Sequence, residues 1–85
     1  MSITVKNHMG VSYEVLRGSE ITKEKANSSY CITLAYSWRD KFDTDIITFV
    51  GGMLHGINKD GTYKGYNTFE PEDLIKIYEY LKDEW

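Results

Sequence analysis

The sequence predicts an α+β domain: an antiparallel β-sheet of four to six strands, built from hairpins and packed against one C-terminal amphipathic α-helix. Two patterns predict it. Up to residue 66, short runs of alternating apolar and polar residues are separated by turn-forming residues, whereas after Pro71 apolar residues recur at steps of three and four. The 85 residues suffice for a single domain, 1–85, with a thin core.

The first element in chain order is a predicted hairpin over residues 2–18. Apolar and polar residues alternate on both sides of Asn7-His8-Met9-Gly10, a segment whose asparagine and glycine suit a tight turn. The next segment is ambiguous: residues 20–27 form either one short helical turn, capped by Ser19, or a polar loop.

Residues 29–38 form the most clearly predicted strand. Its alternation puts large residues on one face and small ones, including Cys31, on the other. The large face is the surface on which we expect the helix to pack; its members are Tyr30, Ile32, Leu34, Tyr36 and Trp38.

Two further hairpins complete the predicted sheet. The β-branched run Ile46–Val50 is expected to pair antiparallel with the strand before it and to end at Gly51-Gly52. Residues 53–58 and 62–66 flank Lys59-Asp60-Gly61, and an Asp-Gly pair between two strand-like runs predicts a hairpin.

The predicted helix starts at Pro71, which fits the first helical position and leaves Glu70 or Thr68 as the cap. Phe69 and Leu74 have the spacing of a hydrophobic staple around a cap at Glu70. A helix this short is marginal alone, so its apolar stripe must dock on the sheet. The stripe consists of Leu74, Ile77, Tyr78, Leu81 and Trp85.

The sequence contains no recognisable catalytic constellation, so we expect a protein that is not an enzyme and needs no cofactor. Cys31 could pair with His8 or His55 as a nucleophile, but a thiol between two large strand residues is usually inert. The cysteine and histidines lack paired zinc-ligand spacing. The segment 56–61 only partly imitates a calcium loop, and the Asp-Gly hairpin explains it better, so no metal site is expected.

Charge is distributed unevenly along the chain. Residues 70–85 carry six acidic and two basic side chains, which gives −4, whereas the whole chain has a net charge of −3. Glu72, Glu79 and Asp83 fall on one side of the predicted helix and are the candidate residues for binding a protein partner with a basic surface. A solvated face that only keeps the protein soluble is the simpler explanation of the same charges.

Excess tyrosine adds a second candidate surface. Tyr63 and Tyr66, or an unpaired strand edge, could bind a partner or form a homodimer. The chain shows no signal peptide, no disulfide-forming pair and no apolar stretch long enough to span a bilayer, so we expect a cytoplasmic protein without a membrane partner.

The leading hypothesis is therefore a non-enzymatic protein-interaction module. Small acidic domains of this type resemble the accessory inhibitors encoded by phages and mobile elements, including anti-CRISPR-like blockers of host nucleases; the resemblance is one of type and covers no motif. It implies an inhibitor of a basic, nucleic-acid-handling protein. The alternative is a domain that binds a nucleotide or single-stranded nucleic acid on exposed tyrosine and tryptophan, although the overall acidity and the absence of a basic stripe disfavour direct nucleic-acid binding. A small hydrolase or transferase using Cys31 or the loop 40–45 is the third possibility.

Overall fold

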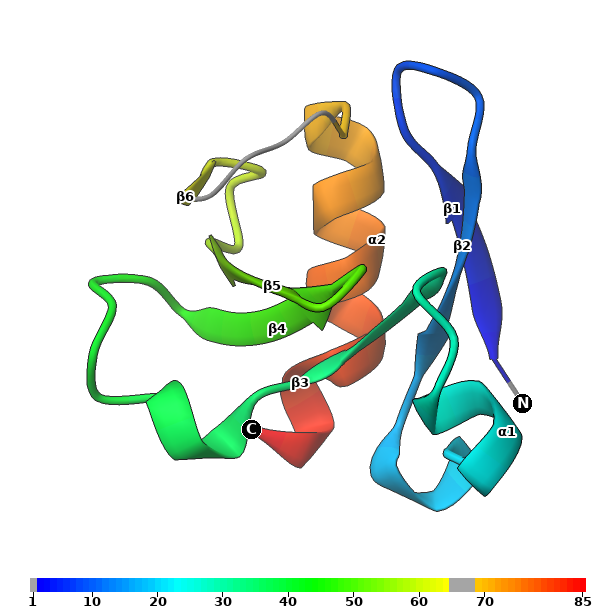
Figure 1. Cartoon of the computed structure of the whole chain (residues 1–85). Helices are drawn as coiled ribbons and strands as arrows, with labels where there is room; N and C mark the ends of the chain where they lie inside the picture. The colour runs from blue at the N-terminus through cyan, green and yellow to red at the C-terminus, as the bar shows by residue number, and fades with distance from the viewer. Residues whose placement is uncertain (1, 65–68) are drawn as a thin grey trace.

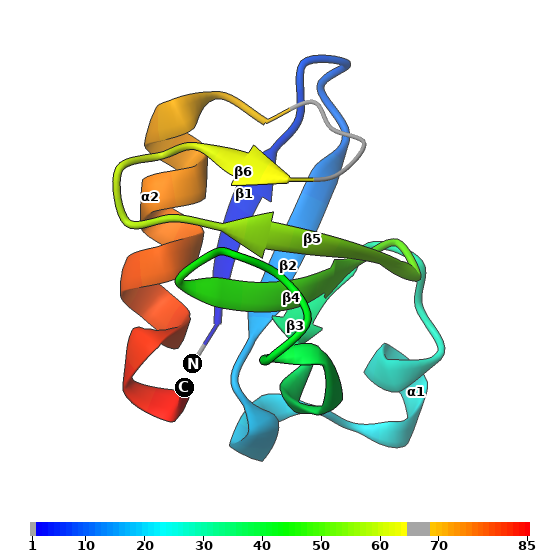
Figure 2. The same ribbon diagram turned by 90° about the vertical axis from the view of Figure 1, so that its left-hand side faces the viewer.

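A six-stranded sheet curls into a half-barrel around one C-terminal helix in the computed structural model, which describes residues 2–64 and 69–85 (Figures 1 and 2). The strands lie in the sheet in the order in which they occur in the chain. The predicted α+β class, with a sheet of four to six strands and one packed helix, is therefore confirmed. The elements are β1 (Ile3–Lys6), β2 (Ser12–Leu16), the 3₁₀ turn η1 (Gly18–Glu20), α1 (Lys23–Ala26), β3 (Cys31–Leu34), the 3₁₀ turn η2 (Tyr36–Trp38), β4 (Ile46–Val50), β5 (Met53–Ile57), β6 (Tyr63–Lys64), α2 (Pro71–Leu81) and the 3₁₀ turn η3 (Lys82–Glu84).

The first hairpin is formed by β1 and β2, which pair antiparallel as predicted. Its turn is held by the side chain of Asn7, whose Oδ1 accepts hydrogen bonds from the backbone N–H groups of Met9 (2.9 Å) and Val11 (3.0 Å). Gly10 has a φ of 79°, a value that glycine adopts without the steric cost other residues meet.

The pair β2–β3 departs from the prediction because it is parallel. Residues 17–30 return the chain to the end of the sheet at which β2 begins. A parallel pair of strands requires a crossover of this kind. The crossover contains η1 and α1, so the short helical turn expected near residues 20–27 is present. Its cap is Thr22, whose hydroxyl accepts from the N–H of Lys25 at 3.1 Å, and not Ser19.

The expectation of one long aromatic strand face over residues 29–38 is wrong in part. β3 ends at Leu34, and the chain coils into η2, which carries Tyr36 and Trp38 away from the core. Ile32 is fully buried and Leu34 packs against the core, but Tyr30 is exposed. The surface that receives the helix is therefore aliphatic and spans several strands.

The remaining hairpins follow the sequence prediction. β4 pairs antiparallel with β3 and with β5, and Gly51-Gly52 forms the tight turn between β4 and β5, with φ of 56° and 83°. β5 and β6 flank the predicted Asp-Gly turn. Tyr66 lies outside the described residues.

The helix α2 buries the predicted stripe. Leu74, Ile77 and Leu81 are buried, and Tyr78 and Trp85 pack against the same core from half-buried positions. Phe69 and Leu74, the two residues of the predicted staple, belong to one buried cluster. Within the described part of the chain, no helix has the length and apolar character needed to cross a membrane.

Candidate functional site: the outer face of α2 and its groove

The three acidic residues singled out from the sequence lie together on the outer face of α2 and of η3, the turn that continues it. Glu72, Glu79 and Asp83 are all exposed. Their spacing of seven and four residues keeps them on one side of the helix, opposite the stripe formed by Leu74, Ile77 and Leu81. The three carboxylates thus lie on one side of the helix, as their spacing predicted.

Two lysines lie beside this acidic row and offset part of its charge. Lys76 Nζ is 3.8 Å from Asp73 Oδ1, and Lys82 Nζ is 2.7 Å from Glu79 Oε2. The hydrogen bond from Lys82 to Glu79 raises the pKa of Lys82. Both lysines are exposed, so each pair adds little stability, and Glu72 has no ion-pair partner among the described residues.

The carboxylates at the two ends of the helix have structural partners instead. Glu70 lies 2.8 Å from His8 Nδ1, which ties the start of α2 to the β1–β2 turn. Glu84 accepts the N–H of Gly18 through both oxygens, at 2.9 and 3.1 Å, and receives the hydroxyl of Tyr36 at 3.4 Å. Burial, followed by the nearby Glu84 charge, raises the pKa of Tyr36.

A shallow, mainly apolar groove runs between β1 and α2 next to the acidic row. Its lining consists of Ile3, Thr4, Arg17, Ile75, Lys76, Glu79 and Tyr80. Arg17 is held in place, because its Nε donates to the carbonyl of Tyr80 at 3.0 Å and its guanidinium lies 4.2 Å from the centre of the Tyr80 ring. Ile75, by contrast, is 38% exposed although it is a large aliphatic residue.

This groove could not be predicted from the sequence. Its walls come from opposite ends of the chain, so no local pattern could reveal their proximity. One signal was available: Ile75 is apolar but lies off the predicted stripe, between the acidic positions 72 and 79.

The second predicted surface is only partly described. Tyr63, on the edge strand β6, is 37% exposed, whereas Tyr66 lies outside the described residues. Tyr63 is paired in register with Ile57, so its side chain lies on the same face of the sheet as that core residue.

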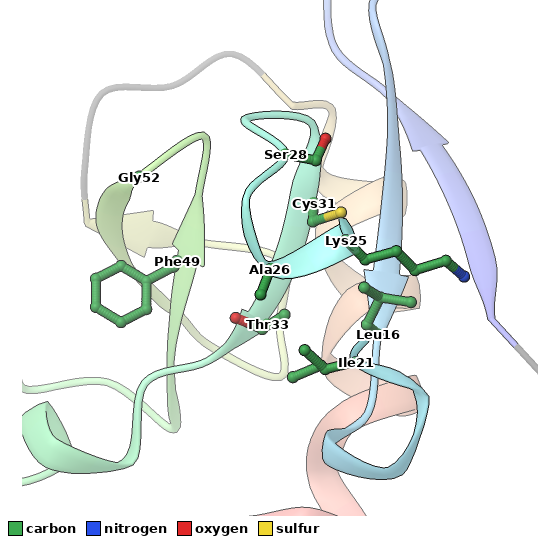
Figure 3. Close-up of a pocket in the computed structure, with 9 residues that line it drawn as sticks. All are labelled: Leu16, Ile21, Lys25, Ala26, Ser28, Cys31, Thr33, Phe49 and Gly52. Carbon is green, nitrogen blue, oxygen red and sulfur yellow. The ribbon is translucent and has the colours of Figure 1, made fainter. Parts of the chain in front are cut away.

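Cys31 is separated from both histidines. It lies on the convex face of the sheet and lines a hollow of about 260 Å³ with Leu16, Lys25 and Phe49 (Figure 3). His55 lies on the opposite, core-facing side of the sheet, where burial lowers its pKa. His8 is engaged with Glu70 in the distant β1–β2 turn. The Cys–His pair considered from the sequence is therefore not assembled.

The aspartates considered as cation ligands accept hydrogen bonds from groups of the same chain. Asp60 Oδ1 accepts from the N–H and the hydroxyl of Thr62, which lowers the pKa of Asp60, and Asp45 accepts from the N–H of Lys59 at 2.9 Å. Among the residues that the structure describes, no group of three or more histidine, cysteine, aspartate or glutamate side chains could hold a metal ion.

Exposed aromatic rings and basic side chains do meet at η2 and the end of the chain. Tyr36 stacks on Trp85 with ring centres 6.5 Å apart, and Arg39 lies 4.3 Å from the centre of the Trp85 ring. Lys41 covers the Trp38 ring at 4.6 Å. We call this group, Tyr36, Trp38, Arg39, Lys41 and Trp85, the aromatic platform.

Comparisons with protein-family models, with curated proteins and with solved structures find no match for this chain. The two surfaces that the geometry offers are therefore compared on their own chemistry. The outer face of α2 combines carboxylates with an adjoining apolar groove, whereas two rings of the aromatic platform, Trp38 and Trp85, each have a cation of the same chain over one face.

Proposed function

We propose that this chain is a non-enzymatic protein-interaction module that docks through the outer face of α2 onto a partner with a basic surface. Inhibition of a nucleic-acid-handling protein is the activity this would serve, because such proteins present basic surfaces to phosphate and an acidic row can compete for them. The proposal keeps the acidic residues predicted from the sequence, Glu72, Glu79 and Asp83, and adds the groove beside them.

The observation that carries the proposal is the exposed Ile75 in an apolar groove bordered by Glu79. Protein interfaces combine an apolar centre, which supplies most of the binding free energy, with a polar rim that sets orientation and association rate. Single exposed apolar residues are common on protein surfaces. Ile75 differs from them because it lines a groove together with a second apolar residue, Ile3.

The test compares two charge-reversal variants of equal net charge. One carries Glu72→Lys, Glu79→Lys and Asp83→Lys on α2; the control carries Glu24→Lys, Asp40→Lys and Asp43→Lys, all exposed and all away from α2. Each variant changes the net charge from −3 to +3, since three acidic residues become three basic ones. Quantitative affinity capture from the native host should lose its salt-sensitive partner with the α2 variant only.

Two outcomes would contradict the proposal. Equal loss of the partner with both variants would mean that net charge alone governs association. Retention of the partner by the α2 variant would remove the acidic row from the interface. Circular dichroism of each variant must match the wild type, which we expect because all six substituted side chains are exposed.

A second candidate function rests on the aromatic platform. The stacked pair of Tyr36 and Trp85, with Arg39 beside it, has the ring faces and positive charge that bind unpaired bases. Quenching of tryptophan fluorescence by a single-stranded oligonucleotide, lost in Arg39→Met, would support it. Carboxylates at Asp40 and Glu84 border the platform and oppose a phosphate backbone, so we rank this function second.

A further inference from the structure

The hollow on the convex face of the sheet has a floor that the strand register fixes. Leu16 on β2 is paired with Thr33 on β3, and Thr33 is paired with Phe49 on β4, so these three side chains form one row across neighbouring strands. Cys31 lies two residues before Thr33 and therefore on the same face. The hollow measures about 260 Å³ and is open on the side of the sheet away from α2 (Figure 3).

Two further segments form the walls of the hollow. The crossover between β2 and β3 contributes Ile21, which is 39% exposed, and Ala26. The turn between β4 and β5 contributes Gly52, and a Cβ at the neighbouring Gly51 would lie 3.0 Å from the carbonyl oxygen of Ser29, so this turn and the crossover touch through their backbones. The hollow is therefore more enclosed than the groove between β1 and α2.

The charge of the lining disfavours an ionic ligand. Lys25 is its only charged residue, and the Nζ of Lys25 lies 3.2 Å from Oε2 of Glu14. Figure 3 shows the side chain of Lys25 running away from Thr33 and Phe49, so its apolar stem borders the hollow and its ammonium group does not face the floor. Neither a cation nor an anion in the hollow would thus find an unpaired charge of opposite sign.

One hydroxyl group of the lining is available for a ligand. Oγ of Ser28 accepts the backbone N–H of Tyr30 at 3.2 Å, whereas the hydroxyl of Thr33 has no hydrogen-bond partner among the described residues. Thr33 lies at the middle of the floor, between two apolar side chains. A ligand with a single hydrogen-bonding group beside an apolar body would therefore match this surface.

The size of the hollow limits the ligand to about one ring. A dry apolar cavity of about 150 Å³ is enough to bind benzene, so a hollow of about 260 Å³ has room for one ring and a short substituent. The half-buried ring of Phe49 forms part of the lining, and aromatic rings attract one another in offset or edge-to-face arrangements. An aromatic ligand would therefore be favoured over an aliphatic one of the same volume.

We propose that this hollow binds a small uncharged molecule that has one aromatic ring and one hydrogen-bonding group. The ring lies against Leu16 and Phe49, and the polar group reaches the hydroxyl of Thr33. Binding is noncovalent and makes no use of the thiol of Cys31. The site goes beyond the proposed function, because it lies on the opposite side of the sheet from the outer face of α2.

The probes are benzyl alcohol, benzylamine and benzoate, which have similar size and differ in charge at pH 7. NMR titration of the whole chain measures their affinities and locates them. Benzyl alcohol should bind saturably with a dissociation constant of about 1 mM, and it should shift the amides of Cys31 and Thr33 and the methyl groups of Leu16. The two charged probes should bind more weakly, because each loses hydration without gaining an opposite charge.

Two substitutions test the assigned contacts. Phe49→Ala should weaken benzyl alcohol binding about fivefold or more, because the ring contact is lost. The matched control is Phe42→Ala, which removes another half-buried phenylalanine that does not line the hollow and should leave the affinity unchanged. Thr33→Val keeps the shape of the floor and should weaken benzyl alcohol but not toluene, because only the alcohol loses a hydrogen bond.

The inference fails if benzyl alcohol does not saturate, or if the shifted signals lie outside the lining. It also fails if a charged probe binds as tightly as the alcohol, or if Phe49→Ala and Phe42→Ala weaken it equally. If no probe binds and Phe49→Ala abolishes capture of the protein partner, the hollow is a protein contact instead. The α2 charge variant should bind benzyl alcohol like the wild type, so failure of the proposed function leaves this site standing, and the reverse also holds.

Discussion

The two faces of the sheet differ in how completely they are covered. The concave face is closed by one regular helix, whose core-facing residues Ile77 and Leu81 have 0% exposure. On the convex face, the short helix α1 borders a hollow beside Phe49 and Cys31 (Figure 3). A helix closes a curled sheet efficiently because its side chains project from one continuous stripe, whereas short turns cover it in patches.

Because the concave face is more completely covered, we expect it to contribute more of the free energy of unfolding of this small domain. A chain of this size has only a few kcal/mol of net stability, so the loss of a single well-packed contact is a large fraction of it. The concave face should therefore be sensitive to substitution, whereas the convex face should be tolerant where its side chains are partly exposed, as at Phe49, and not at its buried residues Leu16 and Ile47. The three predictions below test that assignment, beginning with the largest effect.

The first prediction compares truncation on the two faces. Leu81→Ala should lower the free energy of unfolding by about 2–5 kcal/mol, because the side chain is fully buried and its removal leaves a cavity against the sheet. Phe49→Ala removes more atoms but should cost only about 1 kcal/mol, since the ring is half-exposed beside the hollow. Urea denaturation followed by circular dichroism measures both values. An equal or larger loss for Phe49→Ala would show that the convex face contributes as much as the concave one.

The second prediction concerns the contact that fixes the start of α2. Gly61 has a φ of 87°, and a Cβ placed there would lie 3.0 Å from the carbonyl oxygen of Pro71. Gly61→Ala should therefore cost about 2–3 kcal/mol, the sum of a strained backbone and a forced shift of the helix. Gly52 is a matched control, because its φ is 83° and nothing lies within 4 Å of the added carbon. Gly52→Ala should cost only about 1 kcal/mol. Equal thermal shifts for the two variants would mean that α2 moves away from the turn without loss.

The same two faces explain which parts of the fold the sequence could predict. The stripe from Leu74 to Trp85 was predicted and is observed, because a helix maintains its own period through local hydrogen bonds. The alternation over residues 29–38 was equally regular but ends in a 3₁₀ turn after Leu34. A strand keeps its period only while neighbouring strands pair with it, and that pairing is not encoded locally.

The same distinction between local and tertiary features holds for the candidate site. The sequence located Glu72, Glu79 and Asp83 on one helix face, since their spacing is a local property of α2 and of the turn η3 that continues it. It could not locate the groove, because Ile3 and Ile75 meet only through tertiary packing. Nor could it tell that Cys31 and His55 lie on opposite faces, since that depends on the pairing register of β3, β4 and β5.

The third prediction uses a polar pair within the concave face. His55 on β5 and Thr48 on β4 are cross-strand neighbours, both buried among apolar residues, and Thr48 Oγ1 has no hydrogen-bond partner among the described residues. Burial lowers the pKa of His55 below its usual value of 6.5. Below that pH the unfolded chain binds a proton that the folded chain does not, so the free energy of unfolding should fall as the pH drops. The slope is at most about 1.4 kcal/mol per pH unit for one group.

The control for this effect is His55→Gln, which cannot titrate in that range. Thermal unfolding of the wild type should shift to lower temperature between about pH 7 and pH 5, and the variant should show a smaller shift. The three carboxyls with lowered pKa, Glu14, Glu20 and Asp60, do not interfere. Hydrogen bonds stabilise their charged forms, so their contribution is present above the ordinary pKa of 4.5 for glutamate and 3.8 for aspartate and is lost only at lower pH. An equal shift in the wild type and in His55→Gln would show that another group causes the pH dependence. Protonation of His55 would then not affect the stability of the concave face.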